Sequence, residues 1–229
     1  METAQERHVA APAGRVTVLP QSRQLRAMHT IIRDKDASQR DFTLFSRRII
    51  RQLLEAALEL LPFEERKVTT PIGRTYHGLG FTPDICGVSV VRAGESMEAE
   101  LRDVLPGIRI GKILIQRDKE TKLPHLLYQS LPADIARRHV LLLEPMLATG
   151  GSTLAALDVL RRAGVPDERT VLVNFLASPQ GLERVGQAAP DLRIVTSSIE
   201  EGLTEQAFMI PGIGDFGDRF FGTVPQSAS

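Results

Sequence analysis

The chain has 229 residues, 42% of them hydrophobic, and its 28 Lys and Arg residues balance 28 Asp and Glu residues. This size suits one large domain, and zero net charge argues against a nucleic-acid binder, which usually carries a basic excess. The single cysteine, Cys86, excludes an intramolecular disulfide and indicates a reducing compartment, which we expect to be the cytoplasm. No apolar run reaches the about 18 residues of a membrane span, and we expect no signal peptide.

The N-terminal part predicts a tail followed by helices. Residues 1–20 are rich in Ala, Pro, Gly and Gln, which is typical of a flexible tail, and residues 21–229 are expected to form one domain. A short helix is predicted over residues 24–29, and the charged stretch 31–36 has a turn-like composition. These segments indicate an N-terminal helical extension.

The longest helical pattern runs from Arg40 to Leu61, with apolar residues recurring at helical spacing. Arg47, Arg48 and Arg51 cluster beside its apolar face. They are most simply a solvated helix surface, and the alternative is an anion site or a contact between subunits.

The first candidate site residue follows a strand. Apolar residues 86–91 predict a buried strand that ends at Arg92, where a glycine-containing turn leads into a helix predicted over residues 95–105. A guanidinium group in such a turn suits a diphosphate, because it can bond two oxygens at once. The alternative is that Arg92 merely caps the following helix or pairs with Glu95 or Glu98.

Two other regions predict extended structure. A β-ribbon is expected over residues 67–77. The segments 109–115 and 125–131 flank the densely charged stretch 116–124. An excursion of this kind is either a plain hairpin or a mobile lid.

The central stretch couples a strand to a turn that can hold phosphate. Residues 140–143 predict a buried strand that ends at Glu144, and the turn 149–152 opens a helix predicted over residues 153–163. Glycines, hydroxyls and the N–H groups of the helix start together form a phosphate cradle. Glu144 repels phosphate but can accept from sugar hydroxyls, so the ligand is expected to carry both groups. The alternative is an ordinary turn whose hydroxyls only cap the helix.

The second half of the chain continues this alternation. Residues 170–177 and 192–196 predict buried strands, and residues 182–188 predict a helix between them. Strands alternating with helices indicate an α/β fold with a single wound, mainly parallel sheet flanked by helices. Ligands of such sheets bind at the carboxyl ends of the strands. The residues expected to gather there are Arg92, Glu144 and Ser178.

The C-terminal segment, residues 209–223, is rich in glycine. Gly212–Gly217 matches the G-x-G-x-x-G dinucleotide fingerprint, but only residues 218–229 follow, too few for the helix and strand it requires. Asp215-Phe216-Gly217 mimics a kinase motif, but the other kinase loops are missing from the sequence. Exposed backbone groups of this segment can instead form hydrogen bonds with the edge of a small planar molecule. The alternative is a glycine-rich turn without a binding role.

The string Glu144-Pro145-Met146-Leu147-Ala148-Thr149-Gly150-Gly151-Ser152 and the segment Pro211–Thr223 resemble two signatures of the uracil phosphoribosyltransferases. They look like the loop for the phosphoribosyl donor and the uracil-binding segment of that family. Residues 30–35, 91–98 and 112–117 match in the expected order. The resemblance is nearest to the longer, eukaryote-type branch. It departs at Glu144, where the family usually has Asp, and at Arg47, a position that is often acidic.

This resemblance implies a phosphoribosyltransferase-like fold with a small base-binding hood. The implied reaction joins uracil and 5-phosphoribosyl 1-diphosphate (PRPP) to give UMP and diphosphate, with Mg²⁺ carried by PRPP and not by a metal site of the protein. The residues implied in donor binding are Arg92, Arg117, Glu144, Pro145, Met146, Leu147, Ala148, Thr149, Gly150, Gly151, Ser152 and Asp215. Those implied in uracil binding are Met209, Gly214, Asp215 and Phe216. Those implied in catalysis are Arg92, Arg117, Glu144 and Asp215.

The resemblance also suggests a homo-oligomer, either a dimer or a tetramer, and GTP as an effector. The residues suggested for the GTP-responsive contact are Arg47, Arg48 and Arg51 with Arg33 and Lys35. Two other interpretations stay open: a nucleotide-binding relative with little or no turnover that regulates or partners a uridine kinase, and an RNA-binding regulator on this fold. Glu144 in place of Asp keeps the first open, and zero net charge argues against the second.

Overall fold

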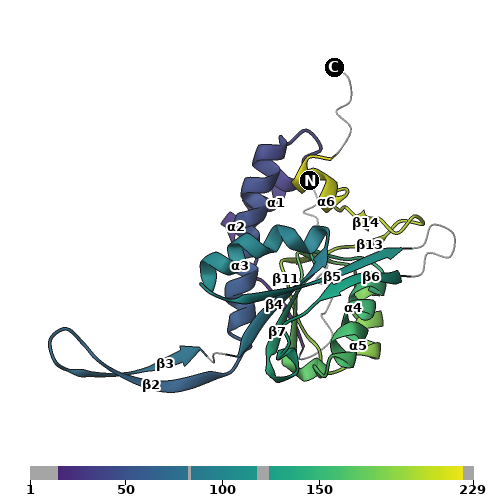
Figure 1. Cartoon of the computed structure of the whole chain (residues 1–229). Coiled ribbons are helices and arrows are strands. Elements are labelled where there is room, and N and C mark those ends of the chain that lie inside the picture. Colours follow the sequence, from purple (N-terminus) through teal and green to yellow (C-terminus); the bar gives the residue numbers. More distant parts are fainter. Residues whose placement is uncertain (1–14, 82–83, 118–123, 224–229) are drawn as a thin grey trace.

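A seven-stranded sheet forms the centre of the computed structural model, which describes residues 15–81, 84–117 and 124–223 (Figure 1). The strand order is β1-β11-β9-β7-β4-β5-β6, and all neighbours are parallel except β5 and β6. The strands are β1 (Val16–Val18), β4 (Ile85–Val91), β5 (Arg109–Arg117), β6 (Pro124–Ser130), β7 (His139–Leu143), β9 (Thr170–Val173) and β11 (Arg193–Thr196). The predicted wound, mainly parallel sheet is confirmed.

Helices cover both faces of this sheet (Figure 1). Successive residues of a strand point to opposite faces, so each strand contributes side chains to a hydrophobic core on either side. In β7, Leu141 and Leu143 pack in one hydrophobic core, and Val140 and Leu142 pack in the other. The first core is covered by α1 (Arg23–Arg33), α2 (Gln39–Leu58), α3 (Glu98–Val104) and α6 (Phe216–Phe221). The second is covered by α4 (Gly151–Arg162) and α5 (Pro179–Ala188). Short 3-10 helices are η1 (Ala93–Met97), η2 (Ile135–Arg137) and η3 (Asp167–Arg169).

The N-terminal helices are capped by serine hydroxyls. Ser22 accepts a hydrogen bond from the backbone N–H of Leu25, and Ser38 caps α2 in the same way. Helix α1 is longer than expected: the turn predicted from residue 31 is wrong, because the helix continues to Arg33 with Ile32 fully buried in the core. Helix α2 confirms the long amphipathic pattern.

Three strands continue beyond a break in the main sheet. The short strands β8 (Met146–Leu147), β10 (Leu176–Ala177) and β12 (Ser198–Ile199) follow β7, β9 and β11 and form a small parallel sheet of their own. The continuous strand predicted over residues 170–177 is therefore wrong, since Asn174 and Phe175 interrupt it. The candidate site forms at this end of the sheet, where the chain leaves β7, β9 and β11.

An antiparallel hairpin extends away from the body as a long arm (Figure 1). It consists of β2 (Phe63–Thr69) and β3 (Thr75–Phe81), paired from Phe63 with Phe81 to Thr69 with Thr75, and it confirms the predicted β-ribbon. Its exposed large apolar side chains are Val68, Ile72, Tyr76, Leu79 and Phe81. A second, short hairpin consists of β13 (Gly202–Leu203) and β14 (Met209–Ile210).

Strand β1 lies inside residues 1–20, which were predicted to be a flexible tail. Its residues pair with β11, so the tail prediction is wrong for Val16–Val18, while residues 1–14 lie outside the described part. Among the helices that the structure describes, none is long and apolar enough to cross a membrane.

The winding direction of the sheet changes between β4 and β7. From β4 the chain moves to β5 on one side, and from β7 it moves to β9 on the other. Loops that leave two adjacent parallel strands in opposite directions open a crevice between them, and ligands of α/β sheets bind there. Arg92 follows β4 and Glu144 follows β7, so both lie at this point.

Candidate active site

Glu144 is held in a buried position at the end of β7. Its side chain is mostly buried, and Thr153 Oγ1 donates a hydrogen bond to its Oε2. The alternative in which hydroxyls of this turn cap α4 is wrong, because the N-cap residue is Gly150 and no side chain caps the helix. The Thr153 hydroxyl instead fixes the direction of the carboxylate at the mouth of the crevice.

The cradle, residues 145–152, is shaped by close contact with α5. Gly150, the N-cap of α4, has a φ of 75°, a left-handed conformation that favours glycine. Ser178 Oγ donates to the carbonyl oxygen of Ala148 at 2.5 Å, and Arg184 Nη1 donates to that of Thr149 at 3.1 Å. These bonds fix the two carbonyls just before the start of α4, whose N–H groups carry the positive partial charge that attracts phosphate.

Asn174 is a supporting residue that the sequence reasoning missed. Its Nδ2 donates to the carbonyl oxygens of Glu144 and Pro145 at 3.1 and 3.0 Å, and its Oδ1 accepts from Thr196 Oγ1 at 2.9 Å. The residue is fully buried, so these bonds are shielded from water. A lone polar residue within an apolar strand was the available signal. Asn174 thereby fixes the backbone on which Glu144 sits.

Arg92 lies at the end of β4, across from Glu144, and contacts the C-terminal helix. Its Nη2 lies 2.5 Å from Asp218 Oδ1, and its Nη1 donates to Thr223 Oγ1 at 2.9 Å. Hydrogen bonds from Thr223 and Arg92 hold the pKa of Asp218 below its usual value. The alternative pairing of Arg92 with Glu95 or Glu98 is wrong.

Those two carboxylates belong to a separate ion cluster beneath the turn. Lys112 Nζ lies 2.5 Å from Glu95 Oε1 and 3.4 Å from Glu98 Oε1, and Ser89 Oγ donates to Glu98 at 2.6 Å. The hydrogen bond with Glu95 raises the pKa of Lys112 above its usual value. The cluster anchors the turn after β4 and leaves Arg92 to its contacts with Asp218 and Thr223.

The third predicted donor residue, Arg117, is the last residue of β5. Its side chain and the charged stretch 118–123 lie outside the described residues. Its predicted role in meeting the diphosphate stays a prediction.

The segment predicted to bind uracil forms a loop that leads into a helix. Asp215 caps α6, because its side chain accepts from the backbone N–H of Asp218 at 2.8 Å. Phe216 is buried, and its ring lies against those of Phe42 and Phe175. The sequence indicated a glycine-rich loop here and missed this helix.

Two arginines fix the backbone of the base loop, which we define as residues 211–216. Arg33 Nη1 donates to the carbonyl oxygen of Gly212 at 3.0 Å, and Arg219 Nη1 donates to that of Ile213 at 2.8 Å. Within residues 15–81, 84–117 and 124–223, the N–H and C=O groups of exposed Gly214 have no hydrogen-bond partner. Gly214 therefore presents one free donor and one free acceptor beside Asp215.

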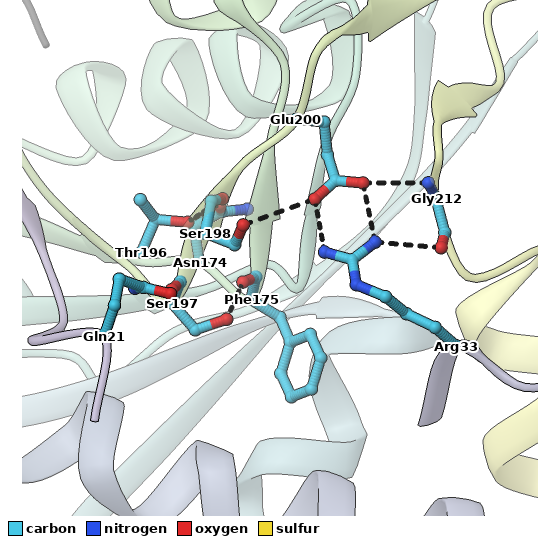
Figure 2. A network of polar contacts seen from close by, with 9 residues as sticks. All are labelled: Gln21, Arg33, Asn174, Phe175, Thr196, Ser197, Ser198, Glu200 and Gly212. Atoms are coloured by element: carbon cyan, nitrogen blue, oxygen red, sulfur yellow. Dashed lines mark hydrogen bonds and ion pairs between the residues drawn. The ribbon is translucent and has the colours of Figure 1, made fainter. Parts of the chain in front are cut away.

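Arg33 is itself held by Glu200, as Figure 2 shows. Its two terminal nitrogens reach Glu200 Oε1 and Oε2 at 2.6 and 2.8 Å, and the N–H of Gly212 donates to Oε2 at 2.8 Å. The guanidinium of Arg33 is thus engaged in this pair, and its suggested part in a GTP-responsive contact with the arginines of α2 stays a prediction.

His29 is buried beside this pair, with its ring 6.2 Å from that of Phe175. Burial, and to a lesser extent the charge of Arg33, lower its pKa from 6.5 to about 4. Neither ring nitrogen has a hydrogen-bond partner among the described residues. The imidazole is neutral at pH 7.

The arginines of α2 line a surface groove of about 750 Å³. Arg47 Nε and Arg51 Nη2 each lie 2.7 Å from a carboxylate oxygen of buried Glu100. Arg48 lies over the ring of Phe45 at 5.5 Å. The groove is lined by Gln24, Gln39, Arg40, Thr43, Leu44, Arg47, Arg48, Arg51, Gln52 and Glu100.

Comparisons with known proteins agree with this geometry. The family profile described as uracil phosphoribosyltransferase matches residues 18–223. A uracil phosphoribosyltransferase of Dictyostelium discoideum is 52% identical over 208 residues, which cover 91% of this chain and 96% of that protein. One of Saccharomyces cerevisiae is 50% identical over 210 residues, covering 92% and 97%. The solved structure of the AQ2163 protein from Aquifex aeolicus has a TM-score of 0.80 at 28% identity, covering 90% of this chain and 97% of that one.

Proposed function

The chain belongs to the uracil phosphoribosyltransferase family, and from this premise we propose that it converts uracil and PRPP into UMP and diphosphate. The observation that carries this proposal is the meeting of the two half-sites at one crevice. The cradle follows β7, and Arg92 after the adjacent β4 contacts Asp218 in the segment that follows the base loop. A donor in the cradle would thus face a base in the base loop.

The chemistry asks for positioning and charge stabilisation more than for a protein nucleophile. N1 of uracil bonds to C1 of the ribose while the bond from C1 to the diphosphate oxygen breaks, and the N1 proton is released. Positive charge develops on the sugar and negative charge on the leaving group. The binding energy of the site is therefore used to align N1 with C1 and to neutralise the diphosphate.

We assign the roles as follows. Glu144, oriented by Thr153, accepts from the ribose hydroxyls, and Leu147–Ser152 bind the 5′-phosphate. Arg92 and Arg117 neutralise the diphosphate. Asp215, within the base loop, contacts both substrates. The uracil edge is read by Met209 and by the backbone from Gly214 to Phe216.

The alternative of a catalytically inactive regulator is not favoured. The relatives that are 50% or more identical over nearly their whole length are uracil phosphoribosyltransferases. Both signatures of the family lie within the matched residues, and Glu144 keeps the carboxylate that the ribose requires.

Mg²⁺ is assigned to the donor. It is a hard cation that prefers phosphate and hydroxyl oxygens, and PRPP supplies both kinds. Among the described residues, no group of three or more His, Cys, Asp or Glu side chains could hold a metal ion. Bound with the donor, the cation would help to neutralise the charge of the leaving diphosphate.

The arginine groove supports GTP as an effector. Arg40 and Arg48 line it and form no ion pair within the described part of the chain, so their guanidinium groups are available to phosphate. Glu100 lowers the positive charge of the groove, because it neutralises Arg47 and Arg51. GTP titrated during activity and sedimentation measurements should change both, and an absence of change in either would contradict this role.

The arm formed by β2 and β3 supports a homo-oligomer, a dimer or a tetramer. A two-stranded hairpin in water is marginally stable alone, and this one exposes five large apolar side chains. A second copy of the chain would cover them. We also propose the cytoplasm as the compartment, since the single cysteine, Cys86, cannot form an intramolecular disulfide.

The direct test uses purified full-length protein with labelled uracil, PRPP and Mg²⁺, and it scores UMP. The matched control replaces PRPP by ribose 5-phosphate, which lacks the diphosphate leaving group and should give no UMP. A folded protein that binds both substrates and forms no UMP would contradict the proposal.

A further inference from the structure

A largely buried ion pair holds the Gly212 end of the base loop against the rest of the protein. Glu200 lies after β12, and Arg33 is the last residue of α1, 167 residues away in sequence. Each of them also bonds to Gly212: the Gly212 N–H donates to Glu200 Oε2 at 2.8 Å, and the Gly212 carbonyl accepts from Arg33 Nη1 at 3.0 Å (Figure 2). Both backbone groups of Gly212 are therefore committed to this pair.

Burial makes the arrangement rigid. The Glu200 side chain is 1% exposed, and that of Arg33 is 23% exposed. A buried carboxylate without partners is strongly unfavourable, so Glu200 cannot release Arg33 or Gly212 without losing charge-assisted bonds. Ser198 Oγ adds a further, longer contact to Oε1 at 3.4 Å. Because Glu200 accepts and Arg33 donates, the Gly212 N–H has to face Glu200 and the Gly212 carbonyl has to face Arg33.

That orientation determines which groups of the loop face the substrate. The carbonyl of Ile213 points to Arg219, whose guanidinium also bonds to the carbonyls of Ile32 and Asp34 at the end of α1. Gly212 and Ile213 are buried, whereas Gly214 and Asp215 are exposed. The backbone groups that remain available to a base are thus those of Gly214 and Asp215, which follow the fixed residues Gly212 and Ile213.

We propose that Arg33 and Glu200 are a positioning pair for the acceptor base: they set the base loop and thereby the affinity for uracil, without contacting the substrate. This inference rests on the proposed function. It requires that weakening the pair reduces uracil binding selectively, because the cradle that holds PRPP is fixed by other contacts through Thr153 and Ser178.

The chain offers a matched control for a purely structural role. Arg138 Nε and Nη2 bond to Asp134 Oδ1 and Oδ2 at 2.9 and 2.6 Å, also as a two-pronged pair with a largely buried arginine. Asp134 and Arg138 flank η2, which precedes β7 at the end opposite to the carboxyl ends of the strands. Asp134→Asn and Glu200→Gln are therefore the same chemical change in two comparable pairs.

The test measures kcat and both KM values for wild type, Glu200→Gln and Asp134→Asn at saturating second substrate. Glu200→Gln should raise the KM for uracil at least tenfold and leave the KM for PRPP within twofold. Asp134→Asn should leave both KM values within twofold, whatever its effect on Tm. Glu200→Asp, which keeps the charge, should recover part of the loss.

Hydrogen exchange supplies a readout that does not need turnover. Amides of residues 212–216 should exchange at least tenfold faster in Glu200→Gln than in wild type, and those of 149–154 should not change. If Glu200→Gln cannot be purified, Arg33→Lys, which keeps the positive charge, must show the same selective rise in uracil KM. An unchanged uracil KM, or an equal rise for both substrates, would overturn the positioning role. Inactivity of the wild type would instead overturn the proposed function.

Discussion

Arg92 Nη2 lies 2.5 Å from Asp218 Oδ1, so the guanidinium expected to meet the diphosphate already pairs with a carboxylate of the C-terminal helix. The two side chains come from opposite halves of the site, since Arg92 follows β4 and Asp218 lies in α6. Both are partly exposed, at 45% and 39%, so the bond is accessible to a ligand. A bound diphosphate would compete with or share this bond.

The first prediction separates the two functions of Arg92. Arg92→Ala should lower kcat/KM for PRPP by about 10²–10³, because it removes a charge-assisted contact to the leaving group. Asp218→Asn breaks the same ion pair but keeps the guanidinium, so it should cost far less. Steady-state kinetics of both variants decide the matter. Equal losses in the two would mean that Arg92 only fastens the C-terminal helix.

The second prediction concerns Arg117. Arg117→Ala should lower kcat while leaving uracil binding nearly intact, since it removes a contact to the leaving group away from the base loop. The expected cost is about 2–4 kcal/mol at the transition state. An unchanged kcat in steady-state kinetics would refute the assignment.

The third prediction tests the carboxylate at the end of β7. Glu144→Asp should preserve or raise activity, and Glu144→Gln should reduce it, because the amide presents a donor where the ribose hydroxyls need an acceptor. The measurement is PRPP affinity in the three proteins. Wild type and Glu144→Gln with equal PRPP affinity would exclude this role for Glu144.

The fourth prediction concerns stability against pH. The folded-state pKa of His29 is lowered from 6.5 to about 4, so folding favours the neutral form. Its contribution is complete above pH 6.5 and is lost as the pH falls from 6.5 to about 4, because the unfolded chain binds the proton first. At 1.36 kcal/mol for each pKa unit, the loss amounts to about 3 kcal/mol.

His29→Phe should therefore flatten the fall in unfolding free energy between pH 7 and 4, measured by urea denaturation. A smaller slope should remain, because burial also lowers the pKa of His139. The control is His77→Gln, on the exposed arm, which should keep the wild-type pH dependence. If His29→Phe also keeps the wild-type pH dependence, the neutral buried imidazole is not the source of that dependence.

The strands could be predicted from the sequence because they follow local rules. Apolar runs bounded by Arg92 and Glu144 predicted two parallel strands, and the C-terminal-end rule then brought these residues to one crevice. The cradle was readable for the same reason, since its glycines and hydroxyls are contiguous. The structure confirms the strands and places both residues at one edge.

The parts that were missed depend on contacts that no local pattern contains. Arg33 and Glu200 are 167 residues apart, and no local sequence pattern indicates that they form a pair. Helix α6 was hidden by its glycines, because burial of Phe216 against distant rings, and not helix propensity, stabilises it. Asn174 was visible as a polar residue in an apolar strand, but its partners were not.

The last prediction is the choice of base. The free N–H and C=O groups at Gly214 cannot exchange donor for acceptor, so a loop that donates to O4 of uracil and accepts from N3–H meets the opposite pattern in cytosine. Each mispaired buried group costs about 1–3 kcal/mol. Orotate adds a carboxylate, and the nearby cation Arg219 is already bonded to three carbonyl oxygens.

The most direct test is therefore the specificity constant for uracil, cytosine and orotate at one PRPP concentration, with the nucleotide product identified. The account predicts UMP from uracil with a constant about 10⁴ higher than for either other base. Cytosine or orotate within about tenfold of uracil, a difference of only about 1.4 kcal/mol, would contradict it.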